Sequence, residues 1–201
     1  MHAAYRAAGG SLDYASFDPM VHAADRALAQ LPEIRRLGFR ETVEAEVGLL
    51  LELAPDRPRV NARQMSDRFY GEAHAAVERN LPVLQRLARR YRLGIVSNFW
   101  GNLAPCLEEL GLAGLFAAVS DSGVIGAAKP DPRIFEETLL ALRAAAQDAW
   151  MVGDNFDADI RAAAGLGMRT CWVAPRERAA PGGVVPTARI TRLPDIEGVL
   201  E

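Results

Sequence analysis

Apolar residues recur at helical spacing through the first eighty residues of the chain. Between Met20 and Leu31 they fall three or four positions apart, and Asp18-Pro19 is typical of a helix start. The same spacing continues over 39–53 and again over 60–77, after a stretch that contains Pro and Arg. This half of the chain therefore predicts a small antiparallel module of helices.

Short apolar runs alternate with longer amphipathic segments from residue 81 onward. Strands are predicted at 93–97, 116–120, 149–152, 170–173 and 189–193. Helices are predicted at 82–90, 103–110, 133–146 and 157–166. This alternation predicts an α/β fold, a Rossmann-like three-layer arrangement in which helices cover both faces of a parallel sheet. The expected organisation is a helical cap domain over 1–80 and an α/β core over 81–201.

Charge and composition narrow the classes of protein. Half of the residues are hydrophobic, and 23 Lys and Arg stand against 26 Asp and Glu, for a net charge of -3. A balanced, slightly acidic surface provides no broad positive field for nucleic acid or an anionic membrane. No apolar run approaches the ~18–20 residues of a membrane helix, and the amino-terminal residues lack the pattern of a secretory signal. We expect a cytoplasmic protein that binds neither nucleic acid nor membrane.

Candidate chemical groups follow the predicted strands. Ligands of open α/β sheets bind beyond the carboxyl ends of the strands, where this sequence places Ser97 and Asp154, with Lys129 in a loop between them. A serine hydroxyl can donate to a phosphoryl oxygen, and a lysine ammonium neutralises its charge. Asp154 and Asp159, with Asp157 between them, are oxygen ligands suited to Mg²⁺. The sequence thus predicts a phosphate site with a magnesium ion.

Each of these residues also has a purely structural interpretation. Ser97 could end a strand, and Asn98 could serve a turn as well as touch a substrate. Lys129 could be a solvated loop lysine. Asp154 and Asp157 could cap the helix that follows, because Asp is favoured at helix starts.

Three segments together resemble a known family. VSN at 96–98, KPDPRIF at 129–135 and VGDNFDAD at 152–159 resemble motifs II, III and IV of the haloacid dehalogenase superfamily in order and spacing. The helical half resembles the C1-type cap of that family. The resemblance implies that Ser97 binds the transferring phosphoryl group, with Asn98 beside it, and that Lys129 steadies it. It implies that Asp154 ligates Mg²⁺, and that Asp159 ligates the ion or orients Lys129 or a metal-bound water.

The Gly153-Asp154 pair favours one branch of this family. Haloacid dehalogenases proper have a motif IV with Ser or Asn and need no metal, so the resemblance is to the magnesium-dependent phosphatases. The expected substrate is a small phosphorylated metabolite, and dehalogenation is the less favoured alternative. A dinucleotide-binding Rossmann protein is disfavoured because no Gly-x-Gly-x-x-Gly follows any predicted strand.

The family's nucleophile motif, an Asp-x-Asp at the end of its first strand, has no counterpart in this sequence. Asp13 and Asp18 follow no apolar strand and begin no such pair. In the family the missing strand is central, between the strand that ends at Ser97 and the one that precedes Asp154. Its loss would leave two ladder edges with orphan backbone groups, each costing about 1–3 kcal/mol when buried.

Three hypotheses account for the missing strand. The reading frame starts late, the two edge strands close together, or a partner donates a strand. Under the first, the complete enzyme is a phosphatase and this chain is itself inactive. The alternative function is a catalytically silent relative that binds a phosphorylated ligand or a protein partner.

Overall fold

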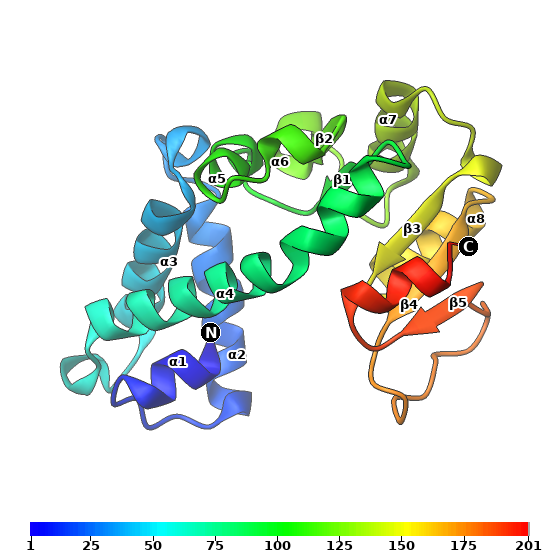
Figure 1. Cartoon of the computed structure of the whole chain (residues 1–201). Coiled ribbons are helices and arrows are strands. Elements are labelled where there is room, and N and C mark those ends of the chain that lie inside the picture. The colour runs from blue at the N-terminus through cyan, green and yellow to red at the C-terminus, as the bar shows by residue number, and fades with distance from the viewer. Residues whose placement is uncertain (201) are drawn as a thin grey trace. The chain divides into compact units, whose positions relative to one another are not determined.

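Two compact units make up the protein in the computed structural model, which describes residues 1–200. The helical unit contains residues 1–79 and 100–113, and the α/β unit contains residues 80–99 and those from 114 onward (Figure 1). The segment 100–113, expected with the α/β core, groups with the helical unit. Its Asn102, which is fully buried, donates from Nδ2 to Thr42 Oγ1 at 2.7 Å and to the Leu37 carbonyl at 3.1 Å. The assignment of 1–80 as a cap domain stays a prediction.

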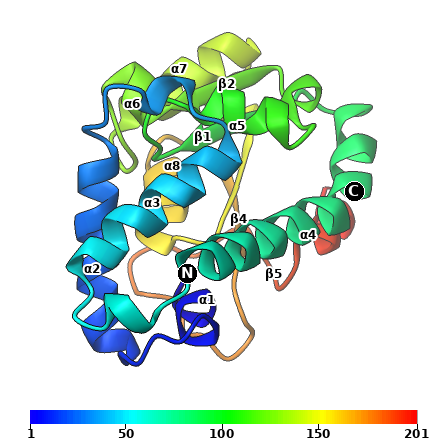
Figure 2. The same ribbon diagram turned by 90° about the vertical axis from the view of Figure 1, so that its left-hand side faces the viewer.

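The helical unit is built from short and medium helices around one apolar core. Its elements are α1 (His2–Ala7), α2 (Tyr14–Leu28), η1 (Ile34–Arg36), α3 (Phe39–Leu53), η2 (Arg57–Arg59), the first part of α4 (Ala62–Ala88) and α5 (Leu103–Glu109). Helices α2 and α3 pack side by side (Figure 2). Val43, Val47 and Leu50 from α3 form the centre of the core with Phe17 from α2. The helical module predicted for this half is therefore present.

Helix α2 begins earlier than the sequence pattern suggested. Its N-cap is Asp13, whose side chain accepts from the Ser16 N–H at 2.9 Å, so the helix starts at Tyr14 instead of near Met20. Pro19 lies inside the helix rather than at its start. The earlier start is favoured because it satisfies an orphan amide of the first turn and buries Phe17 in the core.

Helix α4 is one continuous element where two helices were predicted. It runs for 27 residues and includes Pro82, which the sequence pattern placed at the start of a separate helix. A proline inside a helix leaves the carbonyl four residues earlier without its usual donor. That residue is Glu78, which is exposed, so water can satisfy its carbonyl. Among the helices of residues 1–200, none is both long and apolar enough to cross a membrane.

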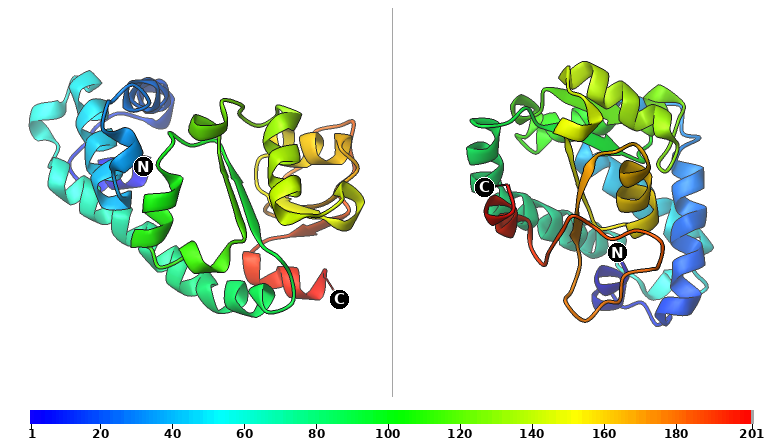
Figure 3. Two further views of the ribbon diagram at one scale, coloured as in Figure 1. Left: turned by 90° about the horizontal axis from the view of Figure 1, so that it is seen from above. Right: turned by 90° about the vertical axis from the view of Figure 1, so that its right-hand side faces the viewer.

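The α/β unit contains five parallel strands in two sheets. One sheet pairs β1 (Gly94–Ser97) with β2 (Ala118–Asp121), and the other has the order β3 (Trp150–Gly153), β4 (Arg169–Val173), β5 (Ala188–Ile190). The remaining elements are η3 (Ala113–Leu115), α6 (Ser122–Ile125), α7 (Pro132–Leu142), η4 (Ala146–Asp148), the π-helical segment η5 (Phe156–Arg161), α8 (Ala162–Gly165) and η6 (Leu193–Gly198). The prediction of a Rossmann-like α/β fold with parallel strands is confirmed, although the sheet is divided (Figure 3).

Two apolar clusters connect the divided sheet. In the first, Ile134 and Phe135 of α7 pack with Met151 of β3 and with Val96 of β1. In the second, the carboxyl-terminal part of α4 packs against β3, β4 and β5, and Leu93, just before β1, belongs to it. Strands β1 and β3 do not pair with each other in the described part of the chain. The hypothesis that these two edges close together is therefore wrong for this structure.

Candidate active site

An ion pair joins the loop between α6 and α7 to the η5 segment that follows β3. Lys129 Nζ lies 2.7 Å from Asp159 Oδ1, and both side chains are largely buried, with 14% and 4% of their surface exposed. The other carboxylate oxygen of Asp159 accepts from the Asn155 N–H at 3.0 Å. Lys129 precedes α7, and Asp159 lies in η5 just after β3. The contact therefore brings together two of the three segments that carry the family motifs.

Asn98 connects the third segment to the same loop. Its side-chain amide donates to the Lys129 carbonyl at 3.0 Å, and its Oδ1 accepts from the Lys129 N–H at 2.7 Å. Both ends of the amide thus bind the backbone of Lys129. Asn98 was predicted as a substrate-binding or turn residue, and the structure adds a third interpretation, a clamp that positions the lysine.

Ser97 and Asp154 are sequence neighbours of the residues in these contacts. Ser97 ends β1, next to Asn98, and is partly exposed; Asp154 directly follows β3 and is exposed. Going through Asn98, Lys129 and Asp159, the contacts lead continuously from the carboxyl end of β1 to that of β3. Of the four residues expected to group together, Lys129 and Asp159 are in direct contact; the grouping of Ser97 and Asp154 with them, and the roles of all four, stay predictions.

Neighbouring acidic residues are engaged in local structure. Asp131 caps α7 by accepting from the Arg133 N–H and forms an ion pair with the Arg133 guanidinium at 2.8 Å. This pairing with Arg133 lowers the pKa of the Asp131 carboxyl. Asp157 is exposed and forms an i,i+4 ion pair with Arg161 at 2.8 Å. The capping role considered for Asp154 and Asp157 falls instead to Asn155, the N-cap of η5, whose side chain accepts from the Ala158 N–H.

Gly153 leaves room for the buried carboxylate. A Cβ at this position would lie 2.3 Å from Asp159 Oδ2 and 2.6 Å from Asp159 Cβ, closer than real contacts allow. A side chain at residue 153 would therefore move Asp159 away from Lys129. The glycine of the VGDN segment is a steric requirement of the ion pair, which sequence spacing alone did not reveal.

We expect Gly153→Ala to destabilise the protein by about 2 kcal/mol or more, because it displaces a buried, paired carboxylate. Urea unfolding monitored by circular dichroism measures this effect. Gly165→Ala is the matched control, since a Cβ at Gly165 in α8 meets nothing within 4 Å. Equal stability of the two variants would contradict the steric argument.

The two carboxylates expected to bind a metal, Asp154 and Asp159, have the chemistry that Mg²⁺ prefers. Among residues 1–200, no three His, Cys, Asp or Glu side chains converge on a common point. The exposed Asp154 carboxylate and the buried Asp159 carboxylate offer only oxygen donors. Mg²⁺ usually keeps several waters and binds through one or two carboxylates plus phosphate oxygens. The oxygen donors of Asp154 and Asp159 therefore suit this ion at the predicted phosphate site.

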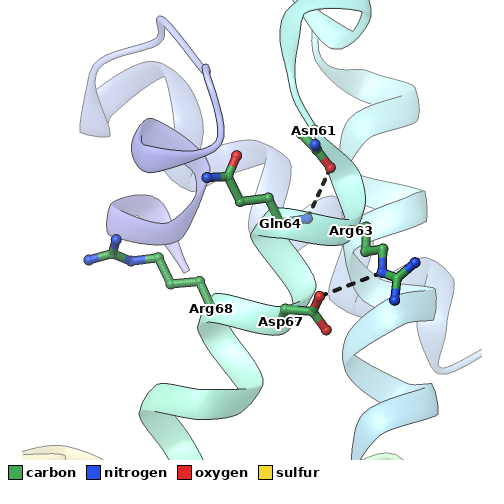
Figure 4. Close-up of a pocket in the computed structure, with 5 residues that line it drawn as sticks. All are labelled: Asn61, Arg63, Gln64, Asp67 and Arg68. Carbon is green, nitrogen blue, oxygen red and sulfur yellow. Dashed lines mark hydrogen bonds and ion pairs between the residues drawn. The ribbon is translucent and has the colours of Figure 1, made fainter.

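The helical unit contains a separate pocket of about 510 Å³ on α4. It is lined by Asn61, Arg63, Gln64, Asp67 and Arg68 (Figure 4). Several of these side chains are in local contacts: Asn61 accepts from the Gln64 N–H, Arg63 lies 3.7 Å from Asp67, and Arg68 lies 2.9 Å from Glu72. None of the predicted site residues lines this pocket. Its lining is the first turns of a helix, and it is distinct from the rim described above.

Comparison with known proteins identifies the family. Residues 12–167 match the model of the haloacid dehalogenase-like hydrolases. The chain belongs to this family of hydrolases, as its three motif segments had indicated. Its structure resembles the magnesium-bound HAD hydrolase YfnB of Bacillus subtilis with a TM-score of 0.64 at 21% identity, covering 99% of this chain and 88% of that one.

Several curated relatives are phosphatases. The chain is 33% identical over 167 residues to a phosphoserine phosphatase of Thermus thermophilus, covering 79% of this chain and 61% of the relative. It is 31% identical over 120 residues to the pyrimidine 5'-nucleotidase YjjG of Escherichia coli, covering 59% and 53%. It is 40% identical over 85 residues to a glyceraldehyde 3-phosphate phosphatase of Pyrococcus abyssi, covering 41% and 35%. The chain thus spans between about a third and three fifths of the length of these relatives.

Proposed function

We propose that this chain forms the phosphate- and metal-binding part of a magnesium-dependent phosphatase that hydrolyses phosphate monoesters of small metabolites. The observation that carries the proposal is the Lys129 ammonium, held 2.7 Å from a buried aspartate and clamped through its backbone by Asn98. A rigid positive charge at the carboxyl ends of parallel strands is a suitable group for a phosphate dianion. The phosphatase relatives support the same reaction class.

Each residue has a role in this proposal. Ser97 donates a hydrogen bond from Oγ to a non-bridging phosphoryl oxygen. Lys129 neutralises the charge that the phosphoryl oxygens carry in the transition state, and Asp159 keeps the lysine in place. Asp154, and Asp159 with its second oxygen, would hold Mg²⁺, which supplies Lewis-acid stabilisation of the phosphoryl oxygens when bound. The proposal assigns no residue of this sequence as the attacking nucleophile.

Phosphate release from a panel of monoesters tests the proposal. Phosphoserine, pyrimidine 5'-nucleotides and glyceraldehyde 3-phosphate are included because the relatives are named for them. The assay compares this chain with a version extended upstream to include an Asp-x-Asp segment, with magnesium and with a chelator. We expect turnover only by the extended version and only with magnesium. An extended version that is inert toward the whole panel, or that turns over without the metal, contradicts the proposal.

A second candidate function, that of a catalytically silent relative, predicts a different result in these experiments. A catalytically silent relative would bind phosphate esters without hydrolysing them, and Lys129→Ala would abolish that binding. Release of halide from a 2-haloacid, measured in the same series, would favour the dehalogenase alternative. We propose a cytoplasmic location and a small phosphorylated metabolite as the ligand, with neither nucleic acid nor membrane as a partner.

A further inference from the structure

The peptide group that joins Asp154 to Asn155 is held at both of its polar ends. The Asp154 carbonyl accepts a hydrogen bond from the indole Nε1–H of Trp172 at 3.1 Å. The Asn155 N–H donates to Asp159 Oδ2 at 3.0 Å. The C=O and the N–H of a trans peptide group lie in one plane and point in opposite directions. Two hydrogen bonds at its opposite ends therefore fix the rotation of this plane, and with it the direction of the backbone that carries the Asp154 side chain.

Trp172 reaches this peptide group from the neighbouring strand. It lies in β4, the middle strand of its sheet, where it is the register partner of Gly153, the residue just before Asp154 (Figure 1). Its side chain is completely buried and packs edge-on against the ring of Phe156, with the ring centroids 5.0 Å apart. The guanidinium of Arg189 lies 4.5 Å from the centroid of the Trp172 ring. These contacts hold the indole, so its N–H has a fixed position.

Packing alone explains the burial of Trp172 but not the choice of acceptor. A buried indole N–H needs a hydrogen-bond partner, and any nearby carbonyl could serve. The acceptor here is the carbonyl of Asp154, which is one of the two residues expected to bind Mg²⁺. The Asp154 side chain is exposed, so its oxygens are available to a metal ion and the hydrogen bond to Trp172 acts on its backbone.

A continuous series of contacts connects the indole to the lysine of the site. Asp159 accepts from the Asn155 N–H through Oδ2 and pairs with Lys129 through Oδ1 at 2.7 Å. Hydrogen bonds in such a series polarise and strengthen one another in a buried setting. The residue expected to bind the metal and the lysine expected to bind phosphate are thus held by one network, and Trp172 is its buried end.

We propose that Trp172 is a positioning residue for the metal ion: its indole N–H holds the Asp154 carbonyl and so orients the Asp154 carboxylate for binding Mg²⁺. Groups that orient a metal ligand typically contribute tenfold or more to metal affinity. This inference rests on the proposed function, because it assumes that Asp154 binds the ion. It adds a residue that lies in β4, outside the three motif segments.

Titration of the whole chain with Mn²⁺ tests this role. Mn²⁺ takes the same oxygen ligands as Mg²⁺, and electron paramagnetic resonance measures how much of it stays free. Trp172→Phe keeps an aromatic ring and removes the N–H, and we expect it to weaken Mn²⁺ binding about tenfold. Trp150→Phe in β3 of the same sheet is the matched control and should bind as the parent does. Parent affinity in Trp172→Phe, or an equal loss in both variants, would overturn the proposal.

A second replacement separates the hydrogen bond from packing. Benzothienylalanine at position 172 keeps the fused ring and has sulfur in place of the N–H, so the core stays filled. We expect this protein to keep a Tm close to that of the parent and to lose Mn²⁺ affinity as Trp172→Phe does. Parent affinity with benzothienylalanine would mean that Trp172 acts by packing alone, and the proposal would be wrong.

Asp154→Asn distinguishes a failure of this inference from a failure of the proposed function. Weaker Mn²⁺ binding by Asp154→Asn, with parent affinity in both replacements of Trp172, would leave the metal site in place and refute the positioning role. A parent chain that binds no Mn²⁺, or an Asp154→Asn variant that binds it as tightly as the parent, would refute the proposed metal site and this inference with it.

Discussion

Replacing Lys129 by methionine is expected to lower kcat/KM for phosphate monoesters by about 10²–10³-fold in an enzyme that carries the nucleophile. The substitution keeps the apolar stem and removes the charge that the proposal aligns with the phosphoryl oxygens. Steady-state phosphate release measures the effect. Arg133→Met is the matched control, because Arg133 is an exposed cation in the first turn of α7, just after Lys129, and pairs with Asp131. A similar loss in both variants would contradict a specific role for Lys129.

The same substitution also unpairs a buried carboxylate, and the two effects can be separated. Removing one partner of a buried pair costs about 3–5 kcal/mol, because the other charge is left uncompensated. The double variant Lys129→Met, Asp159→Asn removes both charges and should recover most of that stability in urea unfolding. It should recover none of the activity. Recovered activity would mean that the lysine acts only as a structural partner of Asp159.

Replacing Glu46 by glutamine is expected to change how stability depends on pH. Glu46 lies in α3 with 7% of its surface exposed; its burial, and secondly the charge of Asp25, raise the pKa of its carboxyl from 4.5 to about 7. A raised pKa means that the folded state holds the proton more tightly than the unfolded state. The stability from this proton is fully present below pH 4.5 and is lost as the pH rises to about 7.

The expected size follows from the shift in the Glu46 pKa. A rise of the Glu46 pKa from 4.5 to about 7 changes the free energy of unfolding by about 3 kcal/mol between acidic and alkaline pH. Glu46→Gln should match the parent protein near pH 4.5 and be more stable than it at pH 8. Urea unfolding at both values measures the difference, with Glu44→Gln as the control because the Glu44 side chain is 55% exposed on the same helix. A parallel pH profile for the parent and Glu46→Gln would contradict a buried, protonated Glu46.

Local patterns were sufficient for much of the fold. The predicted helix over 39–53 matches α3, and four of the predicted strands fall within two residues of β1, β2, β3 and β4. Periodicity is a local property, so a sequence window contains the information. The prolines were misleading for the same reason. Pro19 and Pro82 look like helix starts in a window, but both lie inside helices. The start of α2 before Pro19 buries Phe17 in the core, and Glu78, four residues before Pro82, is exposed to water.

The candidate site was predictable in its residues and less so in its contacts. The predicted strands placed Ser97 at the end of β1 and Asp154 just after β3, because the alternation of elements locates them. Which oxygen faces which nitrogen was not predictable, since Lys129 and Asp159 are 30 positions apart and Asn98 and Lys129 are 31. The need for glycine at 153 arises only once Asp159 folds back onto it.

The sequence by itself determined the family, the parallel α/β class and the residues offered to a phosphate, because motif order and hydrophobic period are written along the chain. Only the tertiary structure decided that Asp159 pairs with Lys129, that Asn98 clamps the lysine backbone, and that β1 and β3 stay apart in residues 1–200. These outcomes depend on distances between segments remote in sequence, where packing and desolvation choose among arrangements that a linear pattern allows equally.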